Sequence, residues 1–351
     1  MERLALLAIL ATLLAAAPRA EEMRLSFILD EGSDWYEACR VFKERVEERT
    51  EGAMTVRIVT NAQLSGNDQQ TELEMLLSGG LESTLESSIL LANVEPAMNI
   101  FTSPWRFANH DEAEAFADGP EGQRLLHVLE ERCGIIGLAW GVNGFRQLTN
   151  SVRPVRAPAD LQGLKIRVAG SGNFHQIFRT FGADPVTMNF GELVTALQTG
   201  AIEGQENPLS VIDSRRLYEV QDHLTIWNYT YDPIALCVNA GWFRSQSSGM
   251  QATLRDCARE AMAAQRVFSR TREAAMLEDL RGKMQVAELT PSEIAAFRAP
   301  FQSTATGTAT AVTSVRFSWL AIGLGLLLAV TVLLVILLLV LNVFAAGRRR
   351  D

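Results

Sequence analysis

The chain has 351 residues, of which 48% are hydrophobic, enough for a large buried core divided between two lobes of ordinary domain size. Its formal net charge of -9 and its pI near 5.2 argue against nucleic acid as a partner. Phosphate binding requires a basic surface stripe, and the sequence contains none. An acidic protein that binds an acidic ligand must therefore use locally placed donors.

Residues 1–20 have the pattern of a secretory signal peptide. One arginine precedes an apolar run from Leu4 to Ala17, and small residues follow before the polar chain begins. We therefore expect the protein to be exported. Pro18 interrupts the expected cleavage motif, so the sequence leaves open whether this segment is cleaved or is retained as an anchor.

The first predicted lobe follows a β-α-β-α-β order. Period-two alternation predicts strands at 23–29 and 54–59, helical spacing of apolar residues predicts helices at 33–50 and 68–77, and a short third segment begins at Leu81. Such alternation of strands and helices is typical of an α/β fold.

Strand-like segments then connect two lobes. Residues 134–140 and 145–149 lead out of the first lobe, and residues 234–239 lead back after Tyr231-Asp232-Pro233. Two crossings of this kind predict a hinged pair of lobes that share a cleft.

Residues 163–208 repeat the β-α-β-α-β order of the first lobe. In the strand at 164–168, apolar residues alternate with Lys165 and Arg167, which places Arg167 on the face that the lobe core does not bury. The later elements are a helix from Gly172 to Gly182, a strand at 185–188, a helix capped by Asn189 and ended by Gly200, and a strand at 201–205. Ligands of open α/β sheets bind at the carboxyl ends of strands. Both Arg167 and Asn207 lie near such ends.

The C-terminal part of the chain carries a membrane signal. A long polar helix at 249–283 is predicted to brace the lobes, and a short helix follows from Thr290. Leu320 to Phe344 contain no charged residue, and a run of about 25 such residues is long enough to span a bilayer. Three arginines follow directly, which predicts a cytoplasmic C-terminus and an external position for everything before the helix.

The cysteines and histidines give no sign of metal or redox chemistry, and we predict no cofactor. No C-x-x-C pair occurs, and the four histidines lack ligand spacing. We expect buried free thiols, although a disulfide in an oxidising compartment remains an alternative. The cysteines are Cys39, Cys133, Cys237 and Cys257, and the histidines are His110, His127, His175 and His223.

Several motifs together resemble the substrate-binding proteins of tripartite ATP-independent periplasmic (TRAP) transporters, a family that includes dicarboxylate and sialic acid binders. The resemblance covers residues 23–297. Its motifs are Asn143-Gly144-Phe145-Arg146, Leu148-Thr149-Asn150, Gly163 to Val168, Gly191-Glu192-Leu193, Thr195-Ala196-Leu197-Gln198, Gly204 to Pro208 and Tyr231-Asp232-Pro233.

The resemblance implies a two-lobed α/β fold like that of periplasmic binding proteins, with hinge-crossing strands and a long bracing helix, to which the sequence adds one C-terminal transmembrane helix. The expected divisions are a signal peptide at 1–20, a first lobe with crossing and bracing elements at 23–141 plus 232–298, a second lobe at 142–231, a linker at 300–316, a transmembrane helix at 319–345 and a cytoplasmic tail at 346–351.

The resemblance also implies roles for individual residues. Arg167 is expected to pair with a substrate carboxylate, with a planar geometry that lysine does not match. Arg146 is expected to be a second cationic contact in the cleft, or else an ion pair that stabilises the lobe crossing. Asn207 is expected to donate from the facing strand end, or else to shape a turn before Pro208. Separately, Phe190 is a candidate cleft wall or a core residue.

The implied function is an extracytoplasmic receptor that binds an organic acid anion and delivers it to the small and large membrane subunits of the transporter, for uptake driven by an ion gradient. It would lie in the periplasm, anchored to the inner membrane by the C-terminal helix. That helix is atypical, since most such binders are soluble, and its end resembles the first helix of the small membrane subunit. It is a tether or part of a fusion.

Two other functions remain as alternatives. One is a membrane-anchored sensory ectodomain for a small carboxylate, and the other is an α/β enzyme. Gly170-Ser171-Gly172 follows a strand as in dinucleotide-binding proteins, but position 175 is histidine where the fingerprint requires glycine. Dicarboxylates, sugar acids, keto acids and amino acids all fit one carboxylate contact, so the sequence does not select among them.

Overall fold

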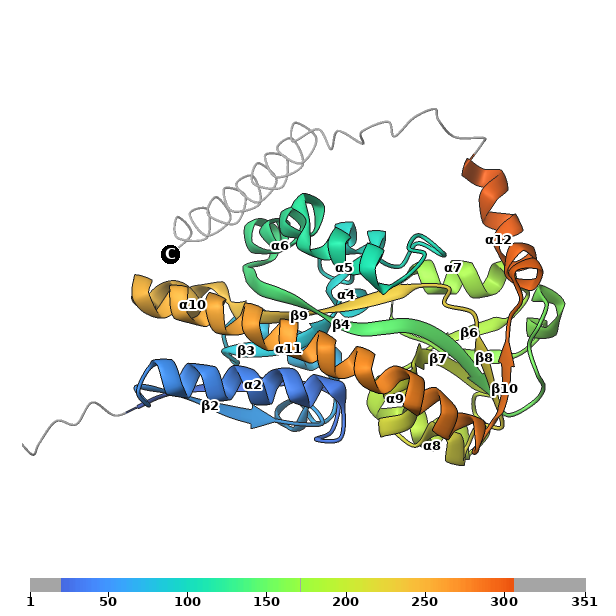
Figure 1. The fold of residues 1–351 in the computed structure, drawn as a ribbon, viewed down its shortest axis with the longest axis horizontal. Coiled ribbons are helices and arrows are strands. Elements are labelled where there is room, and N and C mark those ends of the chain that lie inside the picture. Colours follow the sequence, from blue (N-terminus) through green and yellow to red (C-terminus); the bar gives the residue numbers. More distant parts are fainter. Residues whose placement is uncertain (1–19, 171, 306–351) are drawn as a thin grey trace, which may run out of the picture. The chain divides into compact units, whose positions relative to one another are not determined.

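The structure, a computed structural model, describes residues 20–170 and 172–305. In this part of the chain ten strands form one sheet in the order β2-β1-β3-β9-β4-β7-β5-β6, with β8 paired to both β4 and β10 (Figure 1). No helix within the described residues is both long and apolar enough to cross a membrane. The predicted signal peptide before Ala20, the linker from residue 306 on, the transmembrane helix and the tail lie outside these residues.

The first lobe is built as the sequence predicts. Its strand β1 pairs in parallel with both β2 and β3. Ser33 caps one helix by accepting a hydrogen bond from the Tyr36 amide, and Asp68 caps the next through the Thr71 amide. The elements are β1 (Glu21–Ser26), α2 (Asp34–Arg49), β2 (Met54–Val59), α3 (Gln69–Ser78), β3 (Ser83–Ser87), α4 (Ser88–Leu91), α5 (His110–Asp118), α6 (Pro120–Cys133) and α10 (Ala240–Ser245).

One long strand carries the chain between the lobes. The two strand-like segments predicted at 134–149 form a single strand, β4 (Ile135–Asn150), which pairs antiparallel with β9 (Tyr231–Asn239). The ladder between them shifts register between Val142 and Gly144, and Gly144 adopts a φ of 118°, which favours glycine. Beyond this bulge β4 pairs with strands of the second lobe.

The second lobe places β5 between two parallel neighbours, β6 and β7. The carboxyl ends of β5 and β7 therefore meet at one edge of the sheet, next to the crossing strands. The elements are β5 (Lys165–Val168), α7 (Gly172–Thr180), β6 (Asp184–Thr187), η4 (Phe190–Glu192), α8 (Leu193–Gln198), β7 (Gly204–Pro208), α9 (Leu209–Ser214) and β8 (His223–Ile226).

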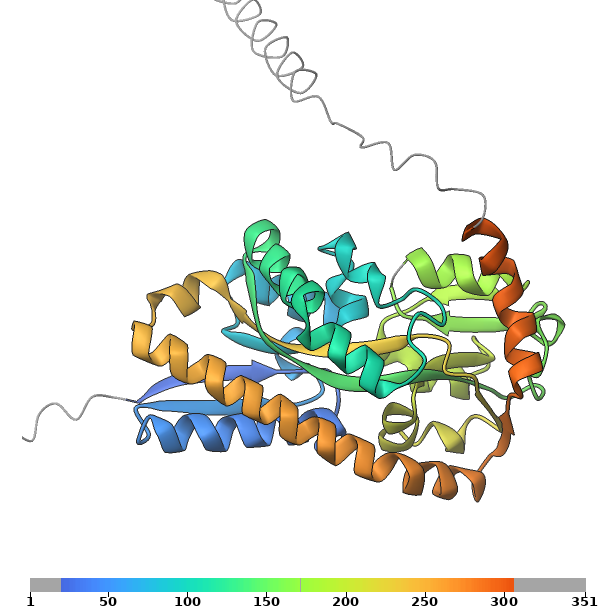
Figure 2. The same ribbon diagram turned by 45° about the horizontal axis from the view of Figure 1, so that its top comes forward.

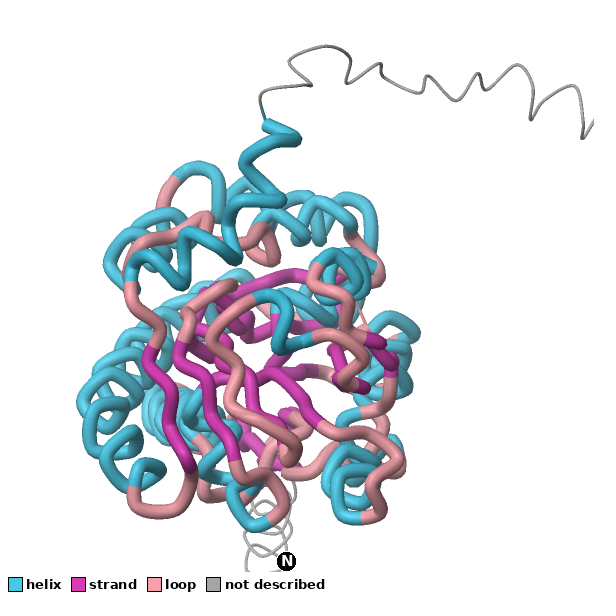
Figure 3. The backbone as a smooth tube through the Cα atoms, turned by 90° about the vertical axis from the view of Figure 1, so that its right-hand side faces the viewer, coloured by secondary structure: helices cyan, strands magenta, loops and turns pink. Residues whose placement is uncertain are grey.

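The long helix α11 (Ser248–Arg281) runs beside elements of both lobes, as predicted for a brace (Figure 2). Viewed from the end, the strands lie in the interior and the helices flank them (Figure 3). All four cysteines are free thiols, and all but Cys133 are buried.

The division of the C-terminal elements differs from the sequence interpretation, which grouped residues 232–298 with the first lobe. Strand β10 (Gln285–Glu288) pairs in parallel with β8, and helix α12 (Pro291–Ala305) places Phe297 against Phe181 and Trp227 of the second lobe. These elements therefore belong to the second lobe. Because α12 continues to Ala305, the first residues of the segment interpreted as a linker are helical.

The core of the first lobe contains two acidic side chains, Glu72 on α3 and Glu86 on β3, both almost fully buried. The Ser26 hydroxyl donates to Glu72, and one oxygen of each carboxyl has no hydrogen bond to a described residue. Burial raises the pKa of Glu72 to about 7, and burial together with the charge of Glu72 raises the pKa of Glu86. At least one of the pair is therefore protonated in the folded protein at mildly acidic pH.

Because the pKa values of Glu72 and Glu86 are raised, we expect the free energy of unfolding to fall as pH rises. The pKa of Glu72 is higher in the folded chain than its ordinary value of 4.5, so folding binds protons between these two values and the free energy of unfolding decreases across that window. The decrease is on the order of 3 kcal/mol. Urea denaturation at pH 5 and pH 7.5 measures it. Glu72→Gln should reduce the decrease, whereas Glu74→Gln, exposed on the same helix, should leave it intact; equal stability at both pH values would contradict the prediction.

Candidate ligand-binding site

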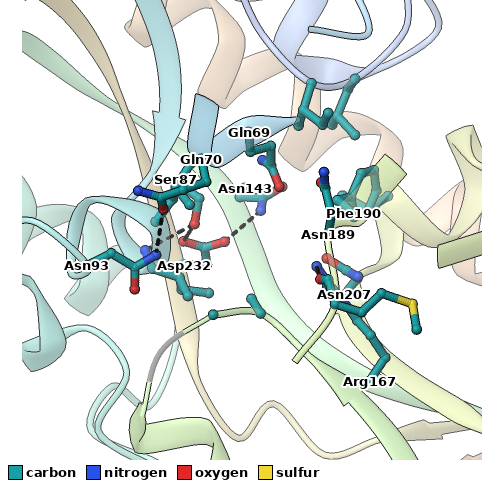
Figure 4. Close-up of a pocket in the computed structure, with 18 of the residues that line it drawn as sticks. Gln69, Gln70, Ser87, Asn93, Asn143, Arg167, Asn189, Phe190, Asn207 and Asp232 are labelled. Carbon is teal, nitrogen blue, oxygen red and sulfur yellow. Dashed lines mark hydrogen bonds between the residues drawn. The ribbon is translucent and has the colours of Figure 1, made fainter. Parts of the chain in front are cut away.

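A cavity of about 340 Å³ lies between the two lobes (Figure 4). The crossing strands and β3 form its floor, with α3 on one side and the ends of β5 and β7 on the other. All four residues predicted from the sequence line it, namely Arg146, Arg167, Phe190 and Asn207. The expectation of two lobes that face one cleft is thus confirmed.

Arg167 is a buried cation with unused hydrogen-bond donors. Its side chain lies near the end of β5, and the residue is only 3% exposed. Nε and Nη2 donate to the Met188 carbonyl oxygen at 3.1 and 2.9 Å, whereas Nη1 donates to no described residue and no described carboxylate lies within 4.0 Å. Burial lowers the pKa of Arg167 to about 10, against the opposing charge of Glu206. It is therefore charged at neutral pH, and no counter-ion from the described part of the chain is in direct contact with it.

Phe190 and Asn207 flank this guanidinium. The Phe190 ring centre lies 5.7 Å from the Arg167 Cζ atom, a cation–π distance. Asn207, on β7, accepts a hydrogen bond from Arg146 Nη2 at 2.9 Å. Phe190 also packs in the hydrophobic core. It therefore both lines the cavity and belongs to the core, the two roles considered for it.

Arg146 differs from Arg167 because carboxylates surround it. Its Nη2 contacts Glu206 Oε1 at 2.9 Å, its Nε also donates to Glu206, and its Nη1 contacts Asp232 Oδ2 at 3.1 Å. Although burial alone would lower the pKa of Arg146, the charges of Glu206 and Asp232 raise it. These contacts favour the alternative of an ion pair at the lobe crossing, because β4, β7 and β9 each contribute one member.

A hydrogen-bond network that sequence reasoning missed completes the floor of the cavity. Asn143, at the bulge of β4, donates to Asp232 at 2.7 Å and accepts from the Trp35 indole at 3.0 Å. The Ser87 and Ser88 hydroxyls donate to the other oxygen of Asp232 at 2.7 and 3.1 Å. Asn143 and Asp232 lie in two of the motifs quoted above, which is the signal that would have identified them.

Among the hydrogen bonds that join the two lobes are three between side chains. Asn189 donates to Asp68 at 2.7 Å, Asn173 donates to Thr102 at 3.0 Å, and Arg215 donates to Asn61 at 3.2 Å. Each bond joins one residue from the first lobe to one from the second. The structure thus represents a closed arrangement of the cleft.

Comparison with protein families decides what kind of protein this is. The family model described as bacterial extracellular solute-binding protein, family 7, matches residues 25–308. The chain belongs to this family. Family 7 members are solute-binding proteins and not enzymes, and a solved periplasmic solute binding protein shares the fold described above. The enzyme alternative is therefore excluded, and the family places the protein in the periplasm.

Individual relatives agree with this assignment. Over 269 residues the chain is 36% identical to a solute-binding protein of Verminephrobacter eiseniae. The match covers 77% of this chain and 79% of the relative. The sugar acid binding protein of Advenella mimigardefordensis, solved with galactonate, superimposes with a TM-score of 0.78 at 32% identity, over 82% of this chain and 93% of that one. A TRAP periplasmic solute binding protein from Shewanella oneidensis, solved with succinate, superimposes with a TM-score of 0.78 at 28% identity. The superposition covers 82% of this chain and 94% of that one.

The two arginines should respond oppositely to removal in the ligand-free protein. Arg146→Met leaves two buried carboxylates unpaired and should lower the free energy of unfolding by about 3–5 kcal/mol. Arg167→Met removes a buried charge that no described carboxylate contacts, so stability should stay constant or increase. Chemical denaturation of the two variants measures this, and similar losses for both would contradict the assigned difference.

Gly191, in η4, lies very close to the opposite lobe. A Cβ atom added to Gly191 would lie 2.5 Å from both the carbonyl oxygen and the side-chain nitrogen of Asn67, on the opposite lobe. Gly191→Ala should therefore disfavour the closed state and weaken ligand affinity about tenfold or more, because a closed state that is less populated binds less ligand. Isothermal titration measures the affinity, and small-angle scattering with ligand measures the opening.

Gly249→Ala is the matched control for this variant. A Cβ at position 249 meets no atom within 4 Å, so affinity and scattering should equal those of the wild type. Unchanged affinity in Gly191→Ala would show that the cleft does not need this close approach.

Proposed function

We propose that this protein is the receptor of a TRAP transporter and that it binds an organic acid anion through an ion pair between the ligand carboxylate and Arg167. It would then deliver the anion to the small and large membrane subunits for uptake driven by an ion gradient. The observation that supports this most strongly is the state of Arg167, a buried guanidinium that faces a cavity and that has unused donors and no carboxylate partner among the described residues.

The energetics of burial explain why this arrangement favours an anion. A charge removed from water is unfavourable unless a counter-ion and hydrogen bonds replace its hydration. A carboxylate in the cavity would supply both, because its two oxygens match the parallel N–H groups of a guanidinium. Arg146 does not compete for the ligand charge, since Glu206 and Asp232 already balance it.

The closed cleft provides the link to delivery. A ligand held between Arg167 on one lobe and polar groups on the other would stabilise the interlobe contacts, and so shift the population toward the closed form. The membrane subunits could thereby distinguish a loaded receptor from an empty one by its shape.

The proposal includes a tether to the inner membrane through residues 320–344. These residues lie outside the described part of the chain, and the apolar sequence followed by arginines supports this step. A tether would keep the receptor near its transporter at an effective concentration on the order of millimolar.

The proposed ion pair predicts a large loss of affinity when Arg167 is changed. A thermal-shift screen of acid metabolites first identifies a ligand, since saturation at 100 times the dissociation constant stabilises the fold by about 2.7 kcal/mol. For that ligand, Arg167→Ala should weaken binding by about 3 kcal/mol or more, and Arg167→Lys should also bind poorly because it offers no planar pair of donors. Isothermal titration calorimetry on the full-length protein measures both.

Arg124→Lys is the control for this experiment. Arg124 is exposed on α6 and pairs with Glu121 on the same helix, so its replacement should leave affinity unchanged. Wild-type affinity in Arg167→Ala would refute the proposed carboxylate anchor.

A further inference from the structure

We infer that the ligand is a hydroxylated monocarboxylate, such as an aldonate, and that the cleft selects against dicarboxylates. This inference rests on the proposed function, because it assumes that one ligand carboxylate pairs with Arg167. It adds the chemistry of the rest of the ligand. The family leaves that chemistry open, since relatives have been solved with both galactonate and succinate.

The charges that line the cavity support one anionic group only. The charged lining residues within the described chain are Asp68, Arg146, Arg167 and Asp232. Two of them, Arg146 and Asp232, are paired with each other, and Arg146 also pairs with Glu206. Arg167 is the remaining cation of this lining set, so a second carboxylate on the ligand would have no counter-ion.

The wall opposite Arg167 is polar but carries amides in place of cations. Figure 4 shows Gln69, Gln70 and Asn93 on one side of the cavity, and Arg167 with Asn207 and Phe190 on the other. The Gln69 amide makes no side-chain hydrogen bond to a described residue, and the Asn93–Gln70 bond is long, at 3.4 Å. Amides of this kind offer both donors and acceptors, which suit a ligand hydroxyl.

Asp68 makes the same wall unfavourable for a second anion. It lines the cavity from the N-terminal cap of α3 and forms no ion pair with a described residue. Its two oxygens accept from the Thr71 amide at 2.8 Å and from Asn189 at 2.7 Å. A ligand carboxylate close to Asp68 would be repelled, whereas a hydroxyl could donate to it.

The dimensions and the remaining lining agree with a small acid. A volume of about 340 Å³ lies near the lower end of ligand pockets, which range from roughly 300 to 1,000 Å³. Apolar side chains such as Ile89, Met188 and Val211 also line the cavity, so the carbon chain of a hydroxy acid would have surfaces to contact between its polar ends.

Ligands matched in chain length test this directly on the full-length protein in detergent. Calorimetry would compare galactonate, galactarate and galactitol, and likewise erythronate, tartrate and erythritol. In the series that fits the cavity, the aldonate should bind about tenfold or more tightly than the diacid. A diacid that binds as tightly as its aldonate in that series would overturn the inference and leave the carboxylate receptor intact.

The polyols separate this inference from the proposed function. If galactitol or erythritol bound as tightly as the corresponding acid, the carboxylate anchor itself would fail. The variant Asp68→Asn keeps a residue that caps helices well, and it should reduce the discrimination against the diacid several-fold. An unchanged ratio of aldonate to diacid affinity in Asp68→Asn would overturn the role assigned to Asp68.

Discussion

The site depends on a difference in charge compensation between two buried arginines. Arg146 and Arg167 lie in the same cavity, and both are almost fully buried. Two carboxylates compensate Arg146, whereas Arg167 makes direct hydrogen bonds only to a backbone carbonyl among the described residues. We propose that the closed cleft therefore offers Arg167 to an anion, with Arg146 as an ion-paired support. This division of roles explains how an acidic protein can accept an acidic ligand.

The fold produces this difference through its crossing strands. Strands β4 and β9 run between the lobes, and their bulge places Asn143 where it fixes Asp232, which in turn pairs with Arg146. Because this network ties the floor of the cleft together, the rims can approach through Asp68 with Asn189, and through Gly191 with Asn67. Arg167 is buried on β5, between β6 and β7, where its guanidinium donates to the Met188 carbonyl and lies near the Phe190 ring of the same lobe.

The sequence predicted the local structure well and the long-range partners poorly. Period-two alternation and capping residues such as Ser33 and Asp68 specify elements over a few residues, and these predictions are confirmed. The partners of Arg146, however, lie 60 and 86 residues away, and no local pattern encodes such a pairing. The same holds for β10, whose parallel partner β8 lies far from it along the chain. The burial of Arg167 likewise involves residues further along the chain, Met188 and Phe190, which the alternation at 164–168 does not specify.

A double-mutant cycle between protein and ligand tests the central claim most directly. The affinities of wild type and Arg167→Gln would be measured for the tightest-binding acid and for its neutral carboxamide, four titrations in all. We predict that the wild type prefers the carboxylate by about 100-fold or more and that the variant loses most of that preference. If Arg167→Gln retained the wild-type preference for the carboxylate, the ligand charge would be recognised elsewhere and the account would be wrong.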